Sequence, residues 1–345
     1  SSASTLYMNA DAELFIQELG LPYLNATRKL KRQIWRPEGP VNIPTPGMVV
    51  SLGVRAFKKF PPLTETSTVE EILLPFFGRR YTDELLSSSL QGIFTAEARD
   101  LHFLSLFPWA KNKTFSNYLQ FILAMKGQMQ AKAAIKIRGS ISFSGGMQKL
   151  IERLREDLSI NIRIRDHAFE LKDNTILCTS APDAAELLQG TAPDVAGILK
   201  EIDYQPVTSY GFILKHPLPQ LKKSFGLLIP QKHGSPVLGI LQQSSIFPQN
   251  YQAPCYTVIC KGKLSVAEVE SELEKRMESF HSDEVLERSL KSWTHGLPLY
   301  NLKRYRAIQQ LEKVLLSHPG LMLFGNYTGG IGLRALIEQT RKLVL

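Results

Sequence analysis

The sequence predicts a mixed α/β (α+β) fold with more than one domain. Its 345 residues, 43 % of them hydrophobic and 21 % charged, are typical of a globular protein with room for more than one core. A strand–helix–strand pattern at 139–182 and a strand–glycine–helix pattern at 321–344 are separated by a strand-rich stretch, and a largely helical stretch at 48–135 precedes them. This order predicts a discontinuous α/β domain that is interrupted by a mixed-sheet domain.

The first 135 residues are expected to hold a helix, two strands and then the helical stretch. Residues 11–20 form an amphipathic helical pattern that Gly20 should end. The apolar side of this helix would consist of Leu14, Phe15 and Leu19. Four prolines within 33–47 argue against a helix there and predict extended edge strands joined by a tight turn. The helical stretch should break at its prolines, namely Pro61, Pro62, Pro75 and Pro108.

The second half of the chain alternates strands and helices. Residues 139–158 predict a strand, two glycines and a helix whose apolar residues recur at helical spacing. Further strands are expected at 160–164, within 168–179 and at several points of 200–260. A helix at 265–280 should begin at Ser265, because Glu268 stands at the capping-box spacing.

The C-terminal stretch is a candidate ligand site. An apolar strand at 321–324 leads through Gly325 to the pair Gly329 and Gly330, and then to a helix. A helix N-terminus carries unpaired N–H groups, and glycines lack the Cβ atoms that would keep an anion away, which suits a phosphate or a polar ring edge. Taken alone, two glycines before a helix more often form only a tight turn, which is our interpretation of SGGMQKL (144–150).

Charge and cysteine content limit the class of protein. The net charge of +9 at pH 7 admits a nucleic acid, an anionic lipid or an acidic ligand, but the basic residues are densest only in RKLKRQIWR (28–36). The three cysteines (Cys178, Cys255, Cys260) include no C-x-x-C pair, so they predict neither a disulfide framework nor a zinc site and fit a reducing compartment. No apolar run reaches ~18 residues, so no membrane-spanning helix is expected. The seven histidines are scattered, and we assign no catalytic residue and no metal ligand.

Six stretches carry a family resemblance through their order and spacing. They are KRQIWRPEGPVNIP (31–44), SFSGGMQKLIERL (142–154), SFGLLIP (224–230), VLGILQQSSIFP (237–248), SWTHGLPLYNLKRYRAIQQLE (292–312) and GLMLFGNYTGGIGL (320–333). Together they resemble the oxygen-dependent protoporphyrinogen oxidases, FAD enzymes of haem synthesis in the amine-oxidase-like flavoprotein superfamily. The resemblance implies a discontinuous FAD-binding domain, a mixed-sheet substrate domain and a helical, membrane-facing domain. The implied parts are 1–47 (substrate-domain strands and a remnant of the FAD-domain edge), 48–138 (helical domain), 139–190 (FAD-binding segment), 191–290 (substrate domain) and 291–345 (C-terminal FAD-binding segment).

Two departures from the family pattern stand out. No G-x-G-x-x-G occurs in the chain, and SSASTLYMNADAELFIQELGL (1–21) resembles family text several tens of residues into the protein. The chain is therefore expected to be a fragment, or a truncated product, without the pyrophosphate-binding strand and helix. The family's G-x-x-x-G-D appears as GIFTAE (92–97), where Ala96 replaces a glycine and is expected to tighten the substrate mouth.

The resemblance implies a macrocyclic substrate with two propionates on one edge and an apolar body. Arg32 is the matched arginine, whose planar guanidinium can bind a propionate through two N–H groups. Without the resemblance, a solvated basic patch would be the commoner interpretation of Arg32. Leu228, Leu241 and Ile259 fall where the family sandwiches the pyrrole rings, and Gly92 would let the main chain approach the ring. Any one of the three aliphatic residues alone would be read as ordinary core, so their convergence on one cavity is the expectation to test.

The resemblance also implies FAD and its contacts. They are Ile164 near the adenine, Trp293 near the isoalloxazine, and Gly325, Asn326, Gly329, Gly330 and Ile331 at the flavin and pyrophosphate end. Trp293 can equally be interpreted as a buried hydrophobic anchor. The implied reaction is the oxidation of protoporphyrinogen IX to protoporphyrin IX in three two-electron steps, each moving a hydride to the flavin, with O2 as the acceptor that reoxidises it.

The stretch at about 90–130 suits a membrane interface as well as a helical core. Its apolar residues lie beside Lys111, Lys113 and Lys126, and they are Phe103, Leu104, Leu106, Phe107, Trp109, Phe115, Tyr118, Phe121 and Ile122. The family's monotopic membrane attachment favours the interface. The implied partners are a porphyrinogen, O2 and a peripheral membrane surface on the cytoplasmic side, with a homodimer as an allowed assembly and without nucleic acid.

Three other functions remain open. A non-catalytic porphyrin-binding or interaction module, left after loss of the N-terminal dinucleotide unit, would bind porphyrin without flavin. Another amine-oxidase-like enzyme, acting on an amine or a carotenoid, would have no use for a propionate-binding arginine. A nucleic-acid-binding protein would show a steep salt dependence.

Overall fold

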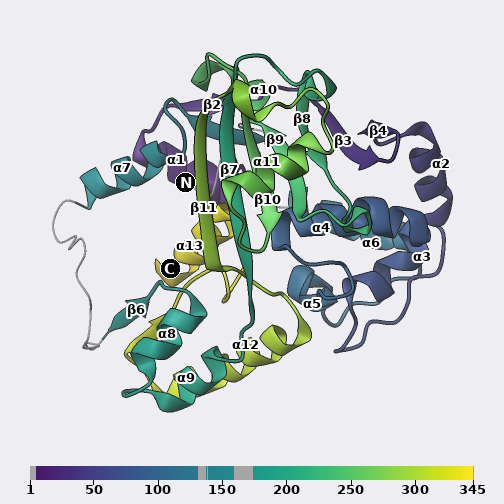
Figure 1. Cartoon of the computed structure of the whole chain (residues 1–345). Coiled ribbons are helices and arrows are strands. Elements are labelled where there is room, and N and C mark those ends of the chain that lie inside the picture. The colour runs from purple at the N-terminus through teal and green to yellow at the C-terminus, as the bar shows by residue number, and fades with distance from the viewer. Residues whose placement is uncertain (1–4, 131–136, 138, 159–173, 345) are drawn as a thin grey trace. The chain divides into compact units, whose positions relative to one another are not determined.

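The computed structural model of the chain describes residues 5–130, 137, 139–158 and 174–344 (Figure 1). These residues belong to two compact units, each built from separate stretches of the sequence. Unit 1 comprises Ser1–Leu24, Ala134–Tyr204 and Leu297–Leu345, and unit 2 comprises Asn25–Ala133 and Gln205–Gly296. The backbone therefore passes between the units four times.

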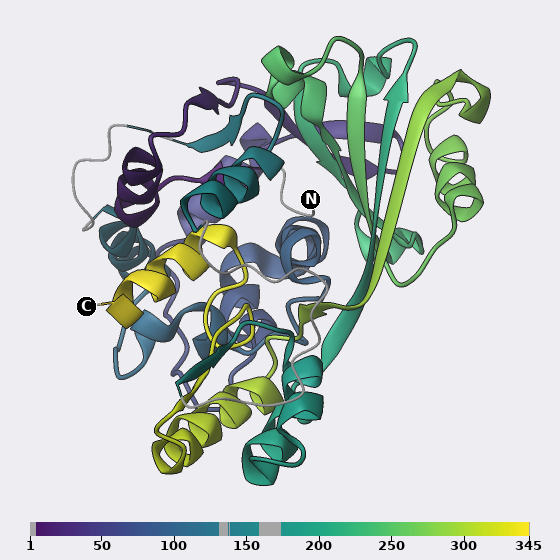
Figure 2. The same ribbon diagram turned by 90° about the vertical axis from the view of Figure 1, so that its left-hand side faces the viewer.

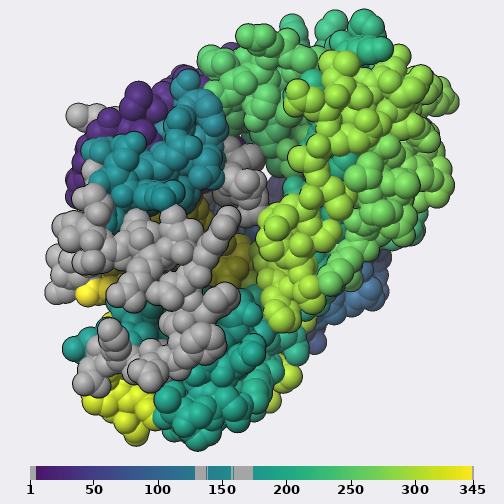
Figure 3. Space-filling model, turned by 60° about the vertical axis from the view of Figure 1, so that its left-hand side comes forward, coloured from purple at the N-terminus to yellow at the C-terminus, as the bar shows by residue number. Residues whose placement is uncertain are grey.

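A seven-stranded sheet forms the framework of unit 2, in the order β11-β7-β10-β9-β8-β3-β4. Its strands are β3 (Lys31–Arg36), β4 (Gly39–Ile43), β7 (Tyr204–Leu214), β8 (Ser224–Leu228), β9 (Val237–Gln242), β10 (Cys255–Lys261) and β11 (Val285–Pro298). β3 pairs with β8 in parallel, whereas the β3–β4, β8–β9, β9–β10 and β10–β7 pairs are antiparallel, so the predicted mixed sheet is confirmed. The proline-rich stretch forms β3 and the edge strand β4 as expected. β11 is the other edge, and most of its side chains are exposed along one face of the molecule (Figure 3).

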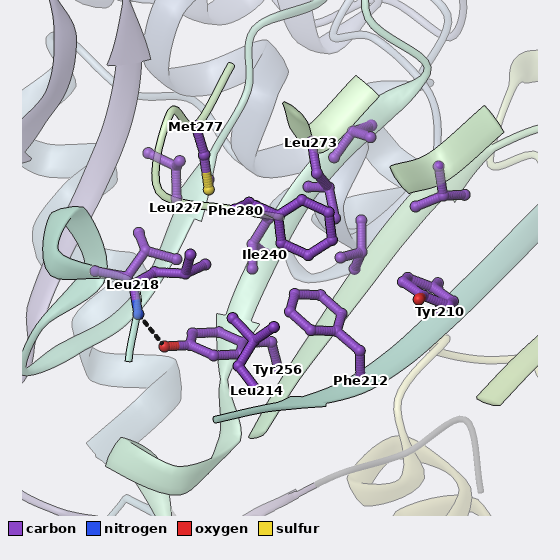
Figure 4. Close-up of a cluster of buried hydrophobic side chains, with 14 of the residues drawn as sticks. Tyr210, Phe212, Leu214, Leu218, Leu227, Ile240, Tyr256, Leu273, Met277 and Phe280 are labelled. Carbon is purple, nitrogen blue, oxygen red and sulfur yellow. Dashed lines mark hydrogen bonds between the residues drawn. The ribbon is translucent and has the colours of Figure 1, made fainter. Parts of the chain in front are cut away.

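One side of this sheet packs with α11 (Val266–Glu274) into a hydrophobic core (Figure 4). The ring of Phe212 stacks between those of Tyr210 and Tyr256, with centroids 5.5 and 5.2 Å apart. The buried Tyr256 hydroxyl accepts a hydrogen bond from the backbone N–H of Leu218 at 2.9 Å, which removes the cost of burying both polar groups. The aromatic residues of β7 and β10 therefore fix the strands at the centre of the sheet.

The helix α11 begins as predicted and ends earlier. Ser265 and Glu268 form the expected capping box, but the helix stops at Glu274 and not at 280. Two further turns follow, in which Met277 N–H donates to Leu273 and Phe280 N–H donates to Met277. These turns keep Met277 and Phe280 in the core. The apolar spacing that predicted a helix to residue 280 therefore continues past the end of α11 at Glu274.

Helices make up most of the remainder of unit 2. They are α2 (Pro46–Arg55), α3 (Val69–Tyr81), the π-helix η1 (Thr82–Leu86), α4 (Ser87–Phe94), α5 (Phe103–Leu106), α6 (Tyr118–Gln130) and α10 (Gln243–Ile246), with short 3₁₀ turns at Pro108–Ala110, Pro219–Leu221, Gln231–His233, Pro248–Asn250 and Ser282–Glu284. The predicted break at Pro75 is wrong, because α3 continues through it. The backbone departs from helical geometry at Gly78 instead, with φ 71° and ψ 156°, a conformation that glycine adopts readily.

Unit 1 contains two small sheets and six helices in its described part. The three-stranded sheet is β1 (Leu6–Tyr7), β5 (Ser140–Phe143) and β2 (Tyr23–Asn25), and the two parallel strands are β6 (Thr175–Leu177) and β12 (Leu321–Leu323). The helices are α1 (Ala10–Leu19), α7 (Gln148–Asp157), α8 (Ala181–Leu188), α9 (Pro193–Leu199), α12 (Leu302–Val314) and α13 (Leu333–Val344), with a 3₁₀ turn at Leu315–Ser317. α13 lies beside α1 (Figure 2), and α12 packs on α9.

The sequence predicts α1 and part of the side that it buries, since Leu19 is buried and Phe15 packs against the same core. The helix ends at Gly20 (φ 60°) as expected, and Ala12, Ile16 and Leu19 are buried against β5 and α13. Leu14 is 45 % exposed, because two residues from Ala12 is about 200° around a helix. The strand predicted at 160–164 lies outside the described residues.

Candidate functional site

A cavity of about 540 Å³ opens on the sheet of unit 2. This volume is within the usual range for small-molecule sites. Strands β3, β8, β9 and β10 supply one wall, and α2 and α4 supply the other. The lining includes all five of the residues expected to bind substrate, which are Arg32, Gly92, Leu228, Leu241 and Ile259.

The strand register explains why residues far apart in sequence meet in this cavity. Side chains alternate along a strand, so residues directly opposite each other on neighbouring strands point to the same side of the sheet. Two such rows cross the cavity wall, Arg32–Gly226–Leu241 and Leu228–Gly239–Ile259. Each row places one glycine between larger side chains, which leaves room above the backbone.

The two row glycines could not be replaced without a shift of the backbone. A Cβ atom on Gly226 would lie 2.4 Å from the carbonyl oxygen of Ile240, and one on Gly239 would lie 2.9 Å from that of Leu227. Gly92 on α4 is different, because a Cβ there would lie 3.5 Å from Leu228 Cδ2, an ordinary contact distance. Gly92 therefore sets the width of the cavity and not the fold around it.

Arg32 is the one charged residue in the described lining of the cavity. Its guanidinium carbon lies 5.5 Å from the centre of the Phe225 ring, a cation–π distance. In the part of the chain that the structure describes, no carboxylate forms an ion pair with Arg32. Arg32 is exposed to solvent, so the cavity presents one accessible, unneutralised positive charge beside mostly apolar walls, which fits a carboxylate attached to an apolar body.

Glu84 ties the helical wall of the cavity to the strand that carries Arg32. Its carboxylate, 9 % exposed, lies 3.1 Å from Arg36 at the end of β3, 3.0 Å from Lys232 and 3.6 Å from Arg80. Burial alone would raise the pKa of Glu84, but Lys232, Arg36 and Arg80 outweigh it and lower the pKa. Glu84 therefore fixes η1 and α4, which carries Gly92, against β3.

Other residues of the cavity were not found from the sequence. Met48 of α2, Ile93 of α4 and Phe225 of β8 line it beside the predicted residues. Only the tertiary fold brings α2 to the sheet, so no local pattern marks Met48. Ala96, expected at the substrate mouth, is buried (3 % exposed) and is not among the lining residues, because the helix ends at Phe94 and the chain turns inward.

The second candidate site is the bend at Gly325–Gly332 of unit 1, between β12 and α13. The Tyr300 hydroxyl lies 2.5 Å from the carbonyl oxygen of Asn326 and 2.6 Å from that of Gly329. Arg304 Nη2 donates a hydrogen bond to the same Gly329 oxygen at 3.0 Å. Thr328 Oγ1 accepts a hydrogen bond from the Gly325 N–H at 3.2 Å. The carbonyl groups of the bend are thereby held by the protein.

The backbone N–H groups in the second half of the bend are not held in this way. Those of Gly329, Gly330, Ile331 and Gly332 donate to no acceptor within the described residues, and the bend is only partly buried. A row of unpaired N–H groups leading into the N-terminus of α13 fits the phosphate oxygens or the ring edge of a dinucleotide. The residues present therefore fit this part of FAD, and Gly329, Gly330 and Ile331 would hold it.

Tyr300 and Arg304 were not predicted as site residues. Burial raises the pKa of Tyr300 to about 12 and lowers the pKa of Arg304. Both stand in the quoted stretch 292–312, but their contacts reach 25 to 29 residues along the chain, which no local pattern shows. Of the other predicted cofactor residues, Trp293 lies half-buried on β11 in unit 2, and Ile164 lies outside the described residues.

Four of the nine apolar residues named at 90–130, Phe103, Leu104, Tyr118 and Phe121, are buried in a helical core. Phe60 packs in the same core, and its ring centre lies 5.0 Å from that of Phe121. The other five, Leu106, Phe107, Trp109, Phe115 and Ile122, are half-buried, so a membrane interface at this stretch stays a prediction. No helix in the described part of the chain is long and apolar enough to cross a membrane.

The one buried histidine of the described residues belongs to the helical core of unit 2. Within the described residues no group of three His, Cys, Asp or Glu side chains could hold a metal ion. His102 is buried, with Nε2 2.7 Å from the Glu65 carbonyl oxygen, so it is tied into the helical core. All three cysteines are free.

The chain is similar in sequence to two protoporphyrinogen oxidases. No family model matches the chain. It is 24 % identical over 383 residues to protoporphyrinogen oxidase 2, chloroplastic/mitochondrial, of Arabidopsis thaliana, which covers 87 % of this chain and 74 % of that protein. It is 25 % identical to mitochondrial protoporphyrinogen oxidase of Nicotiana tabacum, over 74 % of this chain and 62 % of that protein.

Solved structures show the same fold. A protein of Exiguobacterium sp. 255-15 that is assigned as a protoporphyrinogen oxidase matches with a TM-score of 0.76 at 16 % identity, over 99 % of this chain and 86 % of that one. A putrescine oxidase matches with a TM-score of 0.64 at 11 % identity, over 98 % and 85 %. The chain is thus similar in sequence to protoporphyrinogen oxidases, and it has the mixed α/β fold of these solved structures.

Proposed function

We propose that the chain belongs to an FAD-dependent oxidase that converts protoporphyrinogen IX to protoporphyrin IX in haem biosynthesis, with O2 as acceptor. One observation carries the proposal: Arg32 and the three aliphatic residues named from the resemblance line a single cavity. Arg32 would bind a propionate, and Leu228, Leu241 and Ile259 would hold the apolar macrocycle and exclude water from it. FAD supplies the electron transfer when it is bound, at the glycine bend.

The substrate assignment is tested by removing the charge of Arg32. In Arg32→Met we expect the KM for protoporphyrinogen IX to rise about tenfold to a hundredfold, because a hydrogen bond to a charged group contributes ~1.5–3 kcal/mol. Turnover of the chain with added FAD is followed by porphyrin fluorescence. Lys31→Met is the matched control, since Lys31 is the neighbouring exposed cation on β3 and does not line the cavity. Equal KM values for the two variants would remove the cavity from consideration.

A second function is a porphyrin-binding module without catalysis. It is favoured by the fact that the whole cavity is built from unit 2, whereas the glycine bend belongs to unit 1. This alternative predicts that protoporphyrin IX quenches tryptophan fluorescence in flavin-free protein, that Arg32→Met weakens the quenching, and that added FAD produces no turnover. Turnover with FAD would reject it.

We also propose that the protein binds a membrane surface peripherally, with α2 as a candidate contact in addition to the stretch at 90–130. Val49, Val50, Val54 and Phe57 are 57–71 % exposed beside the exposed Lys58 and Lys59, as in an interfacial helix. Met48 of the same helix lines the cavity, so a poorly soluble substrate would enter from the bilayer. Phe57→Glu should reduce co-sedimentation with anionic vesicles, and Leu316→Glu, at an 82 % exposed site, should not. Equal co-sedimentation would reject the membrane contact.

A further inference from the structure

Arg304 places a guanidinium beneath the glycine bend without a carboxylate partner. The residue is 5 % exposed, its Cζ lies 3.8 Å from the centre of the Tyr300 ring, and its Nε has no hydrogen-bond partner. No acidic side chain in the described ranges forms an ion pair with it. Burying a charge without a counter-charge is costly, so this arrangement needs an explanation.

The backbone of the bend indicates where the counter-charge would sit. Tyr300 and Arg304 engage the carbonyl oxygens of Asn326 and Gly329, whereas the N–H groups of Gly329–Gly332 have no acceptor among the residues described. The buried positive charge therefore contacts Gly329, the first of the four residues whose N–H groups are free. Both features favour a negatively charged ligand, and their effects add.

We propose that Tyr300 and Arg304 are positioning residues that make this bend an anion site. They hold the carbonyl groups of the bend, and the charge of Arg304 is balanced by a negative group bound to the N–H groups of Gly329–Gly332. The inference rests on the proposed function, because the negative group would belong to FAD. A phosphate of the dinucleotide and a reduced, anionic isoalloxazine ring share this chemistry.

A purely structural role for Arg304 would need no positive charge. A neutral side chain with one donor could make the single hydrogen bond to Gly329, and it would be cheaper to bury than a guanidinium. The two roles therefore differ in one measurable respect. The anion role needs the charge, and the structural role needs only the donor.

The test measures the affinity of the full chain for inorganic pyrophosphate by titration calorimetry. In Arg304→Gln, which keeps a donor and loses the charge, we expect the dissociation constant to rise at least tenfold. Arg304→Lys keeps the charge and should stay within about threefold of the wild type. The matched control is Arg306→Gln, an exposed arginine of the same helix, which should leave the dissociation constant unchanged.

Two further ligands distinguish the sources of the negative charge. If a phosphate occupies the bend, Arg304→Gln weakens ADP binding and spares reduced riboflavin. If the anionic ring occupies it, reduced riboflavin is weakened and ADP is spared. Either result supports the inference. Oxidised riboflavin is uncharged, and its affinity should not change in any of the variants.

Several outcomes would overturn the inference. One is equal pyrophosphate affinity in Arg304→Gln and Arg306→Gln, and another is a wild-type chain that binds no pyrophosphate. If Arg304→Gln fails to fold, the site is tested by hydrogen exchange of the wild-type protein. Pyrophosphate should slow exchange selectively in a peptide that spans 329–334. Protection of other peptides without protection of this one would reject the site. Pyrophosphate binding without any FAD-dependent turnover would keep this inference and reject the proposed function.

Discussion

Glu84 shows how one residue determines the shape of the candidate site. Three cations converge on its buried carboxylate, and one of them, Arg36, stands four residues after Arg32 on β3. The sequence could not reveal this, because Glu84 and Lys232 are 148 residues apart and each is an ordinary charged residue in its own stretch. The resemblance did name the cavity residues, and three of them, Arg32, Leu228 and Leu241, lie within strand segments whose order along the chain is recognisable.

Glu84→Gln should destabilise the protein by about 3 kcal/mol, because it leaves the partly buried Arg36 without its counter-charge. The free energy of unfolding is measured by urea titration at pH 7. Glu70→Gln is the control, since its partner Arg79 is 70 % exposed and such surface pairs contribute only ~0.2–1 kcal/mol. A loss as small as that of the control would mean that Glu84 does not hold the cavity wall.

The same carboxylate predicts a pH dependence. The pKa of Glu84 is lowered in the folded protein, so its contribution is complete above the unfolded value of about 4.3 and is lost as the pH falls through the folded value. The difference in unfolding free energy between wild type and Glu84→Gln should therefore shrink below pH 4. A difference that stays constant from pH 7 to pH 3 would contradict this assignment.

A substitution at Gly92 should change the size of ligand that the cavity accepts without changing the stability of the protein. A methyl group at this position would occupy space 3.5 Å from Leu228, inside the cavity. Gly92→Ala should weaken protoporphyrin IX binding several-fold and leave the free energy of unfolding, measured by urea titration, within ~0.5 kcal/mol of the wild type. Gly239→Ala is the contrasting variant, because its Cβ would meet a backbone oxygen at 2.9 Å and should lower this free energy clearly.

At the scale of elements, the sequence was most informative about the residues that cap helices. The capping box of α11 and the glycine that ends α1 are local features, and both are present as predicted. The end of α11 and the course of α3 through Pro75 depend on what the elements pack against, which short-range patterns do not report. The hydrogen bonds from Tyr300 and Arg304 to the glycine bend also join residues far apart in sequence, so local patterns do not reveal them.

The cap of α11 can be tested by itself. Ser265→Ala should cost about 1 kcal/mol, because the N–H group of Glu268 loses its acceptor at 3.3 Å. Ser271→Ala, at an exposed position within the same helix, should change the unfolding free energy by less than ~0.5 kcal/mol. Equal effects of the two substitutions on chemical unfolding would show that the cap contributes nothing.

At the scale of the whole molecule, the chain forms two units, and each of them is assembled from separate stretches of the sequence. The alternation of strand-rich and helix-rich stretches indicated an interrupted domain. Unit 2 combines the helical stretch after residue 45 with a sheet whose strands come from both halves of the chain. Long-range pairing such as β3 with β8 decides this grouping, and a single sequence does not specify it.

Unit 2 has its own core, so it should fold alone. Joining 25–133 to 205–296 with a flexible linker of ~12 residues should give a protein that unfolds cooperatively and still binds protoporphyrin IX. Urea unfolding followed by circular dichroism, together with porphyrin titration, checks both points. A chain that lacks a cooperative transition would show that unit 2 depends on unit 1.

The bare backbone of Gly226 and Gly239 limits how this protein can diversify. Neither position accepts even one methyl group without displacing a neighbouring strand, so the floor of the cavity cannot be raised by small steps. Adaptation to a smaller or differently shaped ligand must therefore proceed by substitution of the aliphatic side chains that line the cavity, such as Leu228, Leu241 and Ile259. The depth of the cavity is therefore set by the backbone of the sheet, whereas its ligand selectivity can change by substitution of the lining side chains.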